Sequence, residues 1–144
     1  MKVASYIQTR GSIPLIWTQT PTLKYNPSLG ISGDDLLNER VATQHLEDQV
    51  KKYKDNVLVN LIDKKGSQKT VGDAFTKVVK KVNNEKIHYT WFDFHHECRK
   101  MQWHNIGKLI DEIKPKMESF DYFMATIEGS LSNPGEGSVI LCSQ

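Results

Sequence analysis

The segment Phe92–Lys100 holds the densest group of side chains that could do chemistry: Asp93, His95, His96, Glu97 and Cys98. Histidine, cysteine and aspartate are zinc ligands, so a small metal site around His95, His96 and Cys98 is one hypothesis. The helical metalloprotease motif fails, because Lys100 stands where a second histidine is needed. The other potential ligands are scattered, and we expect no metal. The preferred interpretation is a strand-to-helix junction in which Asp93 caps the helix and His95 or His96 is hydrogen-bonded.

A cysteine-based phosphatase loop requires a cysteine followed six positions later by an arginine. The turn between them aims backbone N–H groups and the guanidinium at one phosphate. The sixth residue after Cys98 is His104, and only Ser143 and Gln144 follow Cys142, so neither cysteine fits. The sequence also contains no Walker loop, dinucleotide fingerprint or Gly-x-Ser-x-Gly elbow. We therefore expect no cofactor.

The composition excludes several classes of protein. The chain has 144 residues, of which 38% are hydrophobic and 25% charged, and this is typical of one globular domain. Its 19 basic and 17 acidic residues give a net charge of +2, which does not indicate a nucleic-acid partner. The most apolar segments fall far short of the roughly 18–20 residues of a membrane-spanning helix. We expect no transmembrane segment and no signal peptide.

Lysines gather in three places, and two interpretations of them stay open. They could contact anionic headgroups, or they could be the solvated faces of two helices and a loop. The tryptophans lie in apolar patterns, so we interpret them as core or subunit-contact residues. The lysines are Lys51, Lys52, Lys54, Lys64, Lys65, Lys77, Lys80 and Lys81, and the tryptophans are Trp17, Trp91 and Trp103.

Periodicity predicts alternating strands and helices. An apolar stripe predicts an amphipathic helix over residues 34–53, and Thr70 with Asp73 resembles a capping pair before a helix over residues 71–83. Strands are expected at 3–8 and 13–18, paired as a hairpin or bent pair, and at 56–62, 87–94 and 122–127; a further helix at 106–117 should break near Pro115. This order predicts an α/β fold with a mixed, largely parallel sheet flanked by helices.

Four motifs, in this order, resemble the Sac phosphoinositide phosphatases, most closely the Sac1 type. The resemblance covers nearly all of residues 3–140. The motifs are Tyr6-Ile7-Gln8-Thr9-Arg10-Gly11-Ser12-Ile13-Pro14-Leu15-Ile16-Trp17, then Leu23-Lys24-Tyr25-Asn26-Pro27, then Val59-Asn60-Leu61-Ile62 with Lys65-Gly66, and finally Phe92-Asp93-Phe94-His95-His96-Glu97-Cys98-Arg99-Lys100-Met101.

The resemblance implies a catalytic domain that removes phosphate from phosphatidylinositol phosphates, using a cysteine nucleophile and a phosphate-binding arginine. Its partners would be phosphoinositide headgroups at the cytosolic face of endoplasmic reticulum and Golgi membranes, although this chain itself is expected in the cytoplasm. In the family the Cys-x5-Arg loop comes just after the position aligned with residues 138–140. This chain instead continues Leu141-Cys142-Ser143-Gln144.

Residues 1–140 are therefore expected to be part of a Sac catalytic domain. Residues 141–144 are expected to be a divergent end, the result of a truncated gene product, a splice change or a gene-model error. Without the nucleophile, we expect this chain alone to be inactive. Arg10, Asp93 and His95 are the expected site-supporting residues; alternatively, Arg10 and Asp93 only form an ion pair that holds the sheet end together. A non-catalytic module that binds phosphoinositides or membranes is the competing hypothesis.

Overall fold

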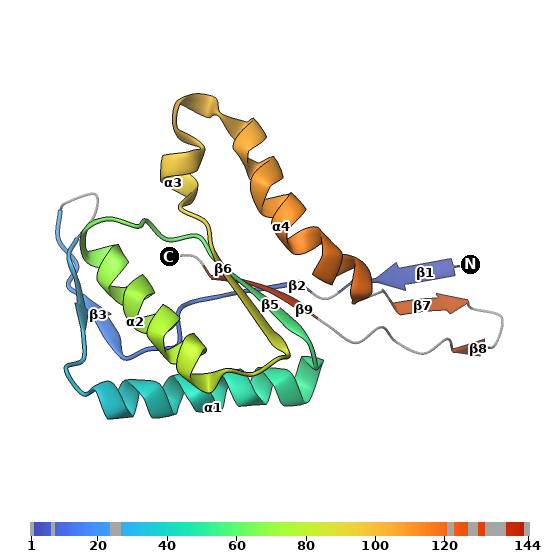
Figure 1. Ribbon diagram of the computed structural model, residues 1–144, viewed down its shortest axis with the longest axis horizontal. Coiled ribbons are helices and arrows are strands. Elements are labelled where there is room, and N and C mark those ends of the chain that lie inside the picture. Colours follow the sequence, from blue (N-terminus) through green and yellow to red (C-terminus); the bar gives the residue numbers. More distant parts are fainter. Residues whose placement is uncertain are drawn as a thin grey trace.

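The computed structural model describes residues 2–6, 8–23, 27–120, 123–126, 130–131 and 138–142, with side chains for residues 4–6, 8–23 and 27–120. Strands and helices alternate over most of this length (Figure 1). The strands are β1 (Lys2–Ser5), β2 (Gln8–Gly11), β3 (Trp17–Gln19), β4 (Leu29–Ile31), β5 (Asn56–Asn60), β6 (Ile87–Trp91), β7 (Phe123–Thr126), β8 (Ser130–Leu131) and β9 (Ser138–Cys142). The α-helices are α1 (Asp35–Tyr53), α2 (Gly66–Val82), α3 (Phe94–Glu97) and α4 (Ile106–Ser119), and two 3₁₀ turns, η1 (Arg99–Met101) and η2 (Trp103–Asn105), connect α3 to α4.

The main sheet has the strand order β2-β9-β5-β6, and all three of its pairings are parallel. Leu58 of β5 lies in register with Ile140 on one side and Tyr89 on the other. Two small antiparallel sheets accompany it, β1-β7-β8 and β3-β4, and the first extends to the right of the main sheet in Figure 1. The predicted mixed, largely parallel α/β fold is confirmed.

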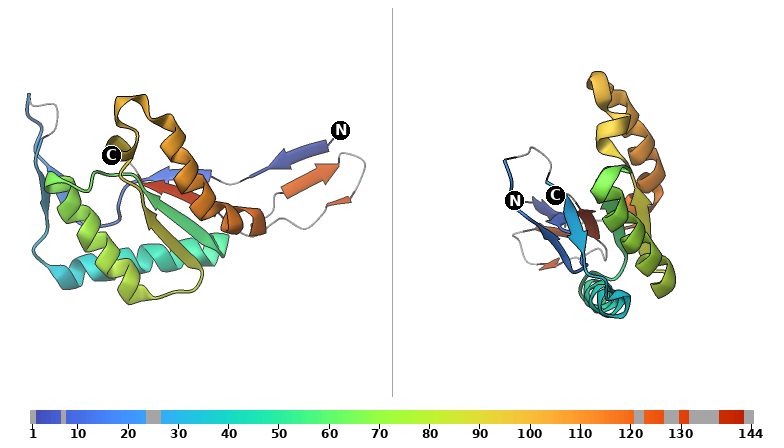
Figure 2. Two further views of the ribbon diagram at one scale, coloured as in Figure 1. Left: turned by 45° about the horizontal axis from the view of Figure 1, so that its top comes forward. Right: turned by 90° about the vertical axis from the view of Figure 1, so that its left-hand side faces the viewer.

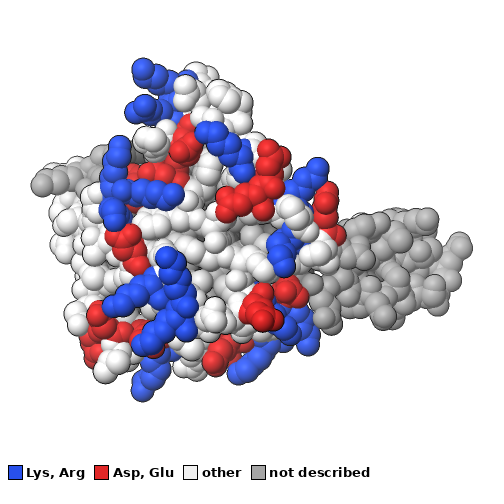
Figure 3. Space-filling model, in the orientation of Figure 1, with Lys and Arg blue, Asp and Glu red and all other residues white. Residues whose placement is uncertain are grey.

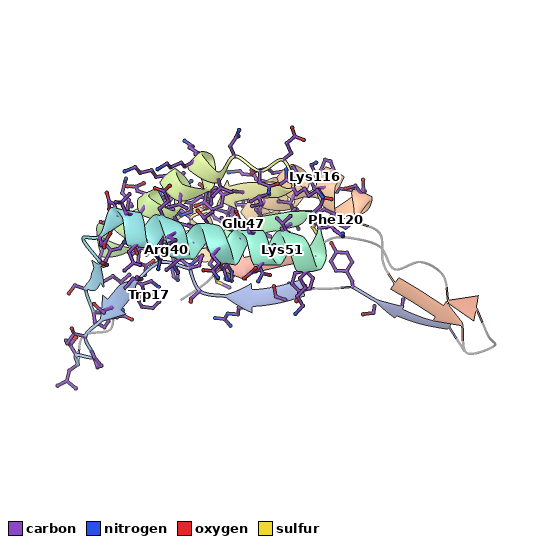
Figure 4. The ribbon with its side chains drawn as sticks, turned by 90° about the horizontal axis from the view of Figure 1, so that it is seen from below. Trp17, Arg40, Glu47, Lys51, Lys116 and Phe120 are labelled. Carbon is purple, nitrogen blue, oxygen red and sulfur yellow. The ribbon has the colours of Figure 1, made fainter. Side chains whose placement is uncertain are left out.

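Helices cover both faces of the main sheet at β5. Because successive strand side chains alternate between faces, Leu58 joins the core formed with α1 and α2, whereas Val57 and Val59 join the core formed with α3 and α4. All five residues of β5 are buried, which explains its continuous apolar run. Figure 2 shows α1 and α4 on opposite sides of the strands. Figure 4 labels Arg40, Glu47 and Lys51, which are exposed along α1, and Lys116 and Phe120 at the end of α4.

Helix α1 begins where the sequence predicts, because the Asp34 carboxylate accepts the Leu37 N–H at 2.9 Å. Ala42 and Leu46 of this helix are buried, whereas Val41 is 39% exposed. Asn38 is also buried, and its side chain accepts the Ile16 N–H at 2.8 Å and donates to the Ser32 carbonyl at 3.0 Å. A polar residue thus joins the helix to the β3–β4 segment.

The predicted hairpin near the N-terminus is wrong. β1 pairs with β7, β2 pairs with β9, and β3 pairs with β4, so each strand takes a partner distant from the expected one. Ile13 and Leu15, which were expected in the second strand, are buried in an irregular segment before β3. Burial in the core replaces local strand pairing there.

Two predicted helix boundaries are also wrong. Helix α2 begins at Gly66 rather than after Thr70, and Asp73 forms an ion pair with Lys69 one turn earlier instead of a cap. Helix α4 continues past Pro115 to Ser119. Burial of Phe120, with Met117 and Ile113 packed beside it, offsets the backbone hydrogen bond that the proline cannot make.

The predicted strands at 56–62 and 87–94 are confirmed as β5 and β6, although both end earlier. The strand predicted at 122–127 is confirmed as β7. It pairs with β1 in an antiparallel sheet and does not belong to the parallel main sheet. Both ends of that prediction lie outside the described residues. The parallel sheet takes β9 instead, a strand that the apolar run at 139–141 did not reveal.

Candidate functional site

The carboxyl ends of all four parallel strands meet at one edge of the main sheet, close to the C mark in Figure 1. In open α/β sheets this edge is where ligands bind. It carries Ser12 after β2, residues 61–65 after β5, and residues 92–96 after β6. In register, Gly11 and Asn60 lie on either side of Cys142, the last residue of β9. β9 therefore ends between the ends of β2 and β5.

Asp93 connects two loops at this edge. Its side chain is buried, with 6% exposure, and it uses both carboxylate oxygens. Oδ1 accepts the His96 N–H at 3.0 Å and so caps α3, while Oδ2 accepts the Lys64 N–H at 2.9 Å from the loop after β5. The predicted cap is confirmed, and the second bond holds neighbouring loops together.

His95 forms a pair with Asp63 across the same edge. Its Nδ1 lies 2.8 Å from Asp63 Oδ1, and its side chain is 75% exposed. The Asp63 N–H in turn donates to Gln68 Oε1 at 2.8 Å, and this bond holds Asp63 beside the first turn of α2. An imidazole held by a carboxylate has a defined orientation and can transfer a proton through its other ring nitrogen.

Asn60 is a site residue that reasoning from the sequence missed. It is fully buried at the end of β5, where Oδ1 accepts the Ile62 N–H at 3.2 Å and Nδ2 donates to the Tyr89 hydroxyl at 2.9 Å. Trp91 Nε1 donates to the Ile62 carbonyl at 2.9 Å, so neighbouring strands fix the backbone of this loop. The available signal was an amide closing an otherwise apolar run, because a buried amide needs partners.

Arg10 lies on β2, the outer strand at one end of the main sheet, whereas Asp93 and His95 follow β6, the outer strand at the other end. It is in β2, opposite Leu141 of β9, and it lines a cavity of about 410 Å³ whose other walls include His45 and Tyr53 of α1. β2 and β6 are the outer strands, three strand spacings or about 14 Å apart. Arg10 and Asp93 therefore belong to opposite ends of the strand order in the main sheet.

The structure does not bring His95, His96 and Cys98 together as ligands of one metal ion. Cys98 is buried at 5% exposure in the core beneath α4, whereas the His95 side chain faces solvent. Among residues 4–6, 8–23 and 27–120, no three histidine, cysteine, aspartate or glutamate side chains gather as metal ligands would. Within the same ranges, no helix has both the length and the apolar character to cross a membrane.

Comparison with known proteins agrees with the motifs. Residues 1–99 match the SacI homology domain family. The chain is 43% identical over 129 residues to phosphatidylinositol-3-phosphatase SAC1 of Saccharomyces cerevisiae, an alignment that covers 89% of this chain and 20% of that protein. It is 42% identical over 135 residues to phosphatidylinositol-3-phosphatase SAC1-A of Danio rerio, covering 94% and 23%.

A relative of another type is similar over a shorter span. Phosphatidylinositide phosphatase SAC2 of Mus musculus is 42% identical over 109 residues, which is 76% of this chain and 10% of that protein. The chain thus spans about a fifth of the SAC1 relatives it matches. On the family match and these identities, the chain belongs to the SacI homology domain family.

Proposed function

We propose that this chain forms part of the catalytic domain of a phosphoinositide phosphatase, an enzyme that hydrolyses phosphate from lipids such as phosphatidylinositol 4-phosphate. The observation that supports this most is the place of β9, an inner strand of the parallel sheet that ends between Gly11 and Asn60. The resemblance puts the nucleophile-bearing Cys-x5-Arg loop directly after residues 138–140. That position would be at the carboxyl edge of the parallel sheet, where ligands bind in open α/β sheets.

The residues around that edge would support the phosphate loop from both sides. Arg10 would contribute a cation from β2 next to the β9 end, and the His95–Asp63 pair would contribute an oriented imidazole from the β6 side. Asp93 would be a positioning residue, since it reaches the loops only through backbone N–H groups. The phosphate loop itself would supply the nucleophile and the principal arginine.

Residues 1–140 would thus be a piece of the catalytic domain, and residues 141–144 a divergent continuation. β9 keeps its register with β5 through Cys142, so the divergence does not interrupt the strand there. Because no cysteine in the 144 residues is followed six positions later by arginine, we propose that this chain alone is inactive. Phosphate release from short-chain phosphatidylinositol 4-phosphate should equal the blank, and release above it would contradict this.

A hybrid enzyme tests the larger proposal. Residues 1–140 would replace the aligned segment of the S. cerevisiae relative, leaving that protein to supply everything on either side. We expect the hybrid to release phosphate from short-chain phosphatidylinositol 4-phosphate, and the same hybrid with the relative's nucleophilic cysteine changed to serine to release none. A folded hybrid with no activity would contradict the proposal.

A further inference from the structure

The connection between α3 and α4 exposes a short run of apolar and basic side chains. All six residues from Arg99 to His104, which we call the tip, are exposed to solvent. Met101 is 78% exposed and Trp103 52% exposed, although both are large apolar side chains. In Figure 1 the tip forms the top of the molecule, beyond α3. Two large apolar side chains two positions apart at a projecting turn form a small exposed apolar patch, and such patches can mark contact surfaces.

The tip is basic and its charges are not neutralised locally. It contains Arg99, Lys100 and His104, and no acidic residue occurs from Cys98 to Ile110. Within the described part of the chain, Arg99 and Lys100 take part in no ion pair. Figure 3 shows Lys and Arg side chains projecting at the top of the molecule, over the α3–α4 connection.

Several lysines of α1 and α2 differ in this respect. Lys81 lies 2.6 Å from Glu39, Lys51 lies 3.5 Å from Asp48, and Lys77 lies 3.9 Å from Asp35. Their positive charge is therefore partly balanced by acidic neighbours. The tip is the better candidate for contact with an anionic surface.

The backbone holds the tip in one shape. Lys100 and Met101 have φ values of 54° and 62°, in the left-handed region that residues with a side chain seldom adopt. Asn105 Nδ2 donates to the Glu97 carbonyl at 2.7 Å, and Lys108 Nζ donates to the Glu97 carboxylate at 3.2 Å. Strained residues at an anchored turn point to a function for that turn.

Trp103 has the geometry of a residue at a lipid interface. One part of its ring packs near Phe94, with ring centroids 6.1 Å apart, and about half of the side chain remains exposed. Tryptophan is enriched at the headgroup level of bilayers, where its apolar ring and its N–H group are both accommodated. A flexible methionine beside it could enter the acyl region.

We propose that the tip inserts Met101 and Trp103 into the interface of an anionic lipid bilayer, while Arg99 and Lys100 contact the lipid phosphates. α3 leads directly from the carboxyl edge of the sheet to the tip, and both lie on the same side of α4 in Figure 1. Docking would therefore hold the candidate site beside the membrane. The proposal rests on the proposed function only in this last respect, because a phosphoinositide substrate would be presented at that surface.

Vesicle co-sedimentation tests this inference on the whole chain. Vesicles of phosphatidylcholine with a minor share of phosphatidylserine, and vesicles of phosphatidylcholine alone, would be compared at low salt. We expect binding to the anionic vesicles only, weakened about fivefold for each basic side chain removed in Arg99→Ala and Lys100→Ala. Trp103→Ala should weaken it to a similar degree or more.

Leu36→Ala is the control for loss of an exposed apolar side chain outside the tip, because Leu36 on α1 is 78% exposed. It should bind like the unmodified chain, and circular dichroism should show that every variant is folded. The Trp103 contribution to fluorescence, obtained by difference from Trp103→Phe, should shift to the blue on binding. Binding that the tip variants leave unchanged, or no binding to anionic vesicles, overturns the proposal.

The two proposals can fail separately. Vesicle binding uses phosphatidylserine and measures no hydrolysis, whereas the hybrid enzyme acts on a dispersed short-chain substrate and needs no vesicle. An active hybrid together with tip variants that bind normally would overturn the membrane contact alone. An inactive hybrid together with tip-dependent binding would overturn the proposed function alone.

Discussion

A single carboxylate, that of Asp93, connects the loop after β5 to the start of α3. Because the group is buried and both oxygens accept backbone N–H groups, its charge is matched by hydrogen bonds. Asn60 performs a comparable role without a charge, since its side-chain amide accepts a hydrogen bond from the Ile62 N–H and donates one to the Tyr89 hydroxyl. The edge of the sheet is therefore organised by polar residues that need not touch a substrate.

Asp93→Asn should destabilise the chain by about 1.5–3 kcal/mol. The amide can still accept one N–H, but its NH₂ group would face the other backbone donor. Asp34→Asn is the matched control, because Asp34 caps α1 from an exposed position and asparagine caps almost as well; its cost should stay within about 0.5 kcal/mol. Urea unfolding measures both, and equal effects would contradict the role given to Asp93.

His88 makes stability depend on pH. Burial and, secondarily, the Lys116 ammonium lower its pKa below the ordinary value of 6.5, against a smaller opposite effect of Asp55. Its Nε2 is buried without a hydrogen-bond partner among the described residues. The unfolded chain therefore binds a proton at His88 more readily than the folded chain does.

Above about pH 6.5, His88 is neutral in both the folded and the unfolded chain and does not reduce the free energy of unfolding. That free energy should fall as the pH falls through the lowered pKa of His88. His88→Leu should reduce the fall in unfolding free energy below that pH. Lys116→Ala should reduce it in part, since one cause of the shift is removed. If the pH dependence of unfolding were the same in all three proteins, His88 would not be the group responsible.

At the scale of elements, α2 approaches β6 closely at Gly72. A Cβ at this position would lie 2.4 Å from carbons of the Trp91 ring, and that ring is held by its bond to the Ile62 carbonyl. The helix thus packs against the residue that fixes the loop after β5. A change on α2 can disturb the candidate site without reaching it.

Gly72→Ala should destabilise the chain by about 1–3 kcal/mol, because the ring cannot move without losing its hydrogen bond. Gly107→Ala in α4 is the control. A Cβ there meets nothing within 4 Å, so the change should stabilise by about 0.5–1 kcal/mol through helix propensity. Guanidinium unfolding separates the two, and a stabilising Gly72→Ala would show that the Trp91 contact is not rigid.

The elements that the sequence predicts well are those with local causes. α1 follows from a capping aspartate and an apolar stripe, and β5 follows from an unbroken apolar run. The hairpin prediction failed because β1 and β2 pair with residues more than a hundred positions away, which no local pattern specifies. Pro115 failed as a helix breaker because tertiary burial outweighs the missing bond.

The same distinction applies to the candidate site. The cap by Asp93 is local, and residue type and position predict it. The pairing of His95 with Asp63, 32 residues apart, depends on the parallel register of β5 and β6 and could not be anticipated. The burial of Cys98, which removes it as a ligand, depends on how α4 folds back over the sheet.

At the scale of the whole molecule, two unequal cores lie on the faces of one sheet. Among the residues whose side chains the structure describes, the core with α1 and α2 contains nine buried hydrophobic residues, and the core with α3 and α4 contains six. Along α2, Val71, Gly72, Phe75 and Val78 are buried, whereas Leu109 is the one buried residue of α4. The α4 side should therefore open at a lower free energy.

Amide hydrogen exchange should show this difference. We expect the amides of α4 to exchange faster than those of α2, with β5 as the internal reference for the most protected residues. Equal protection of the two helices would mean that the molecule opens only as one unit. The tip, which connects α3 to α4, would then share the stability of the larger core.

The position of β9 has a consequence for the order of folding. β9 joins β2 to β5 in the main sheet, and Gln8 pairs with Val139, 131 positions later. During synthesis, β2 must wait until almost all of these residues have left the ribosome before it finds its neighbour. Contacts this distant in sequence make folding slow, and they leave the β2 and β5 edges open to other chains in the meantime.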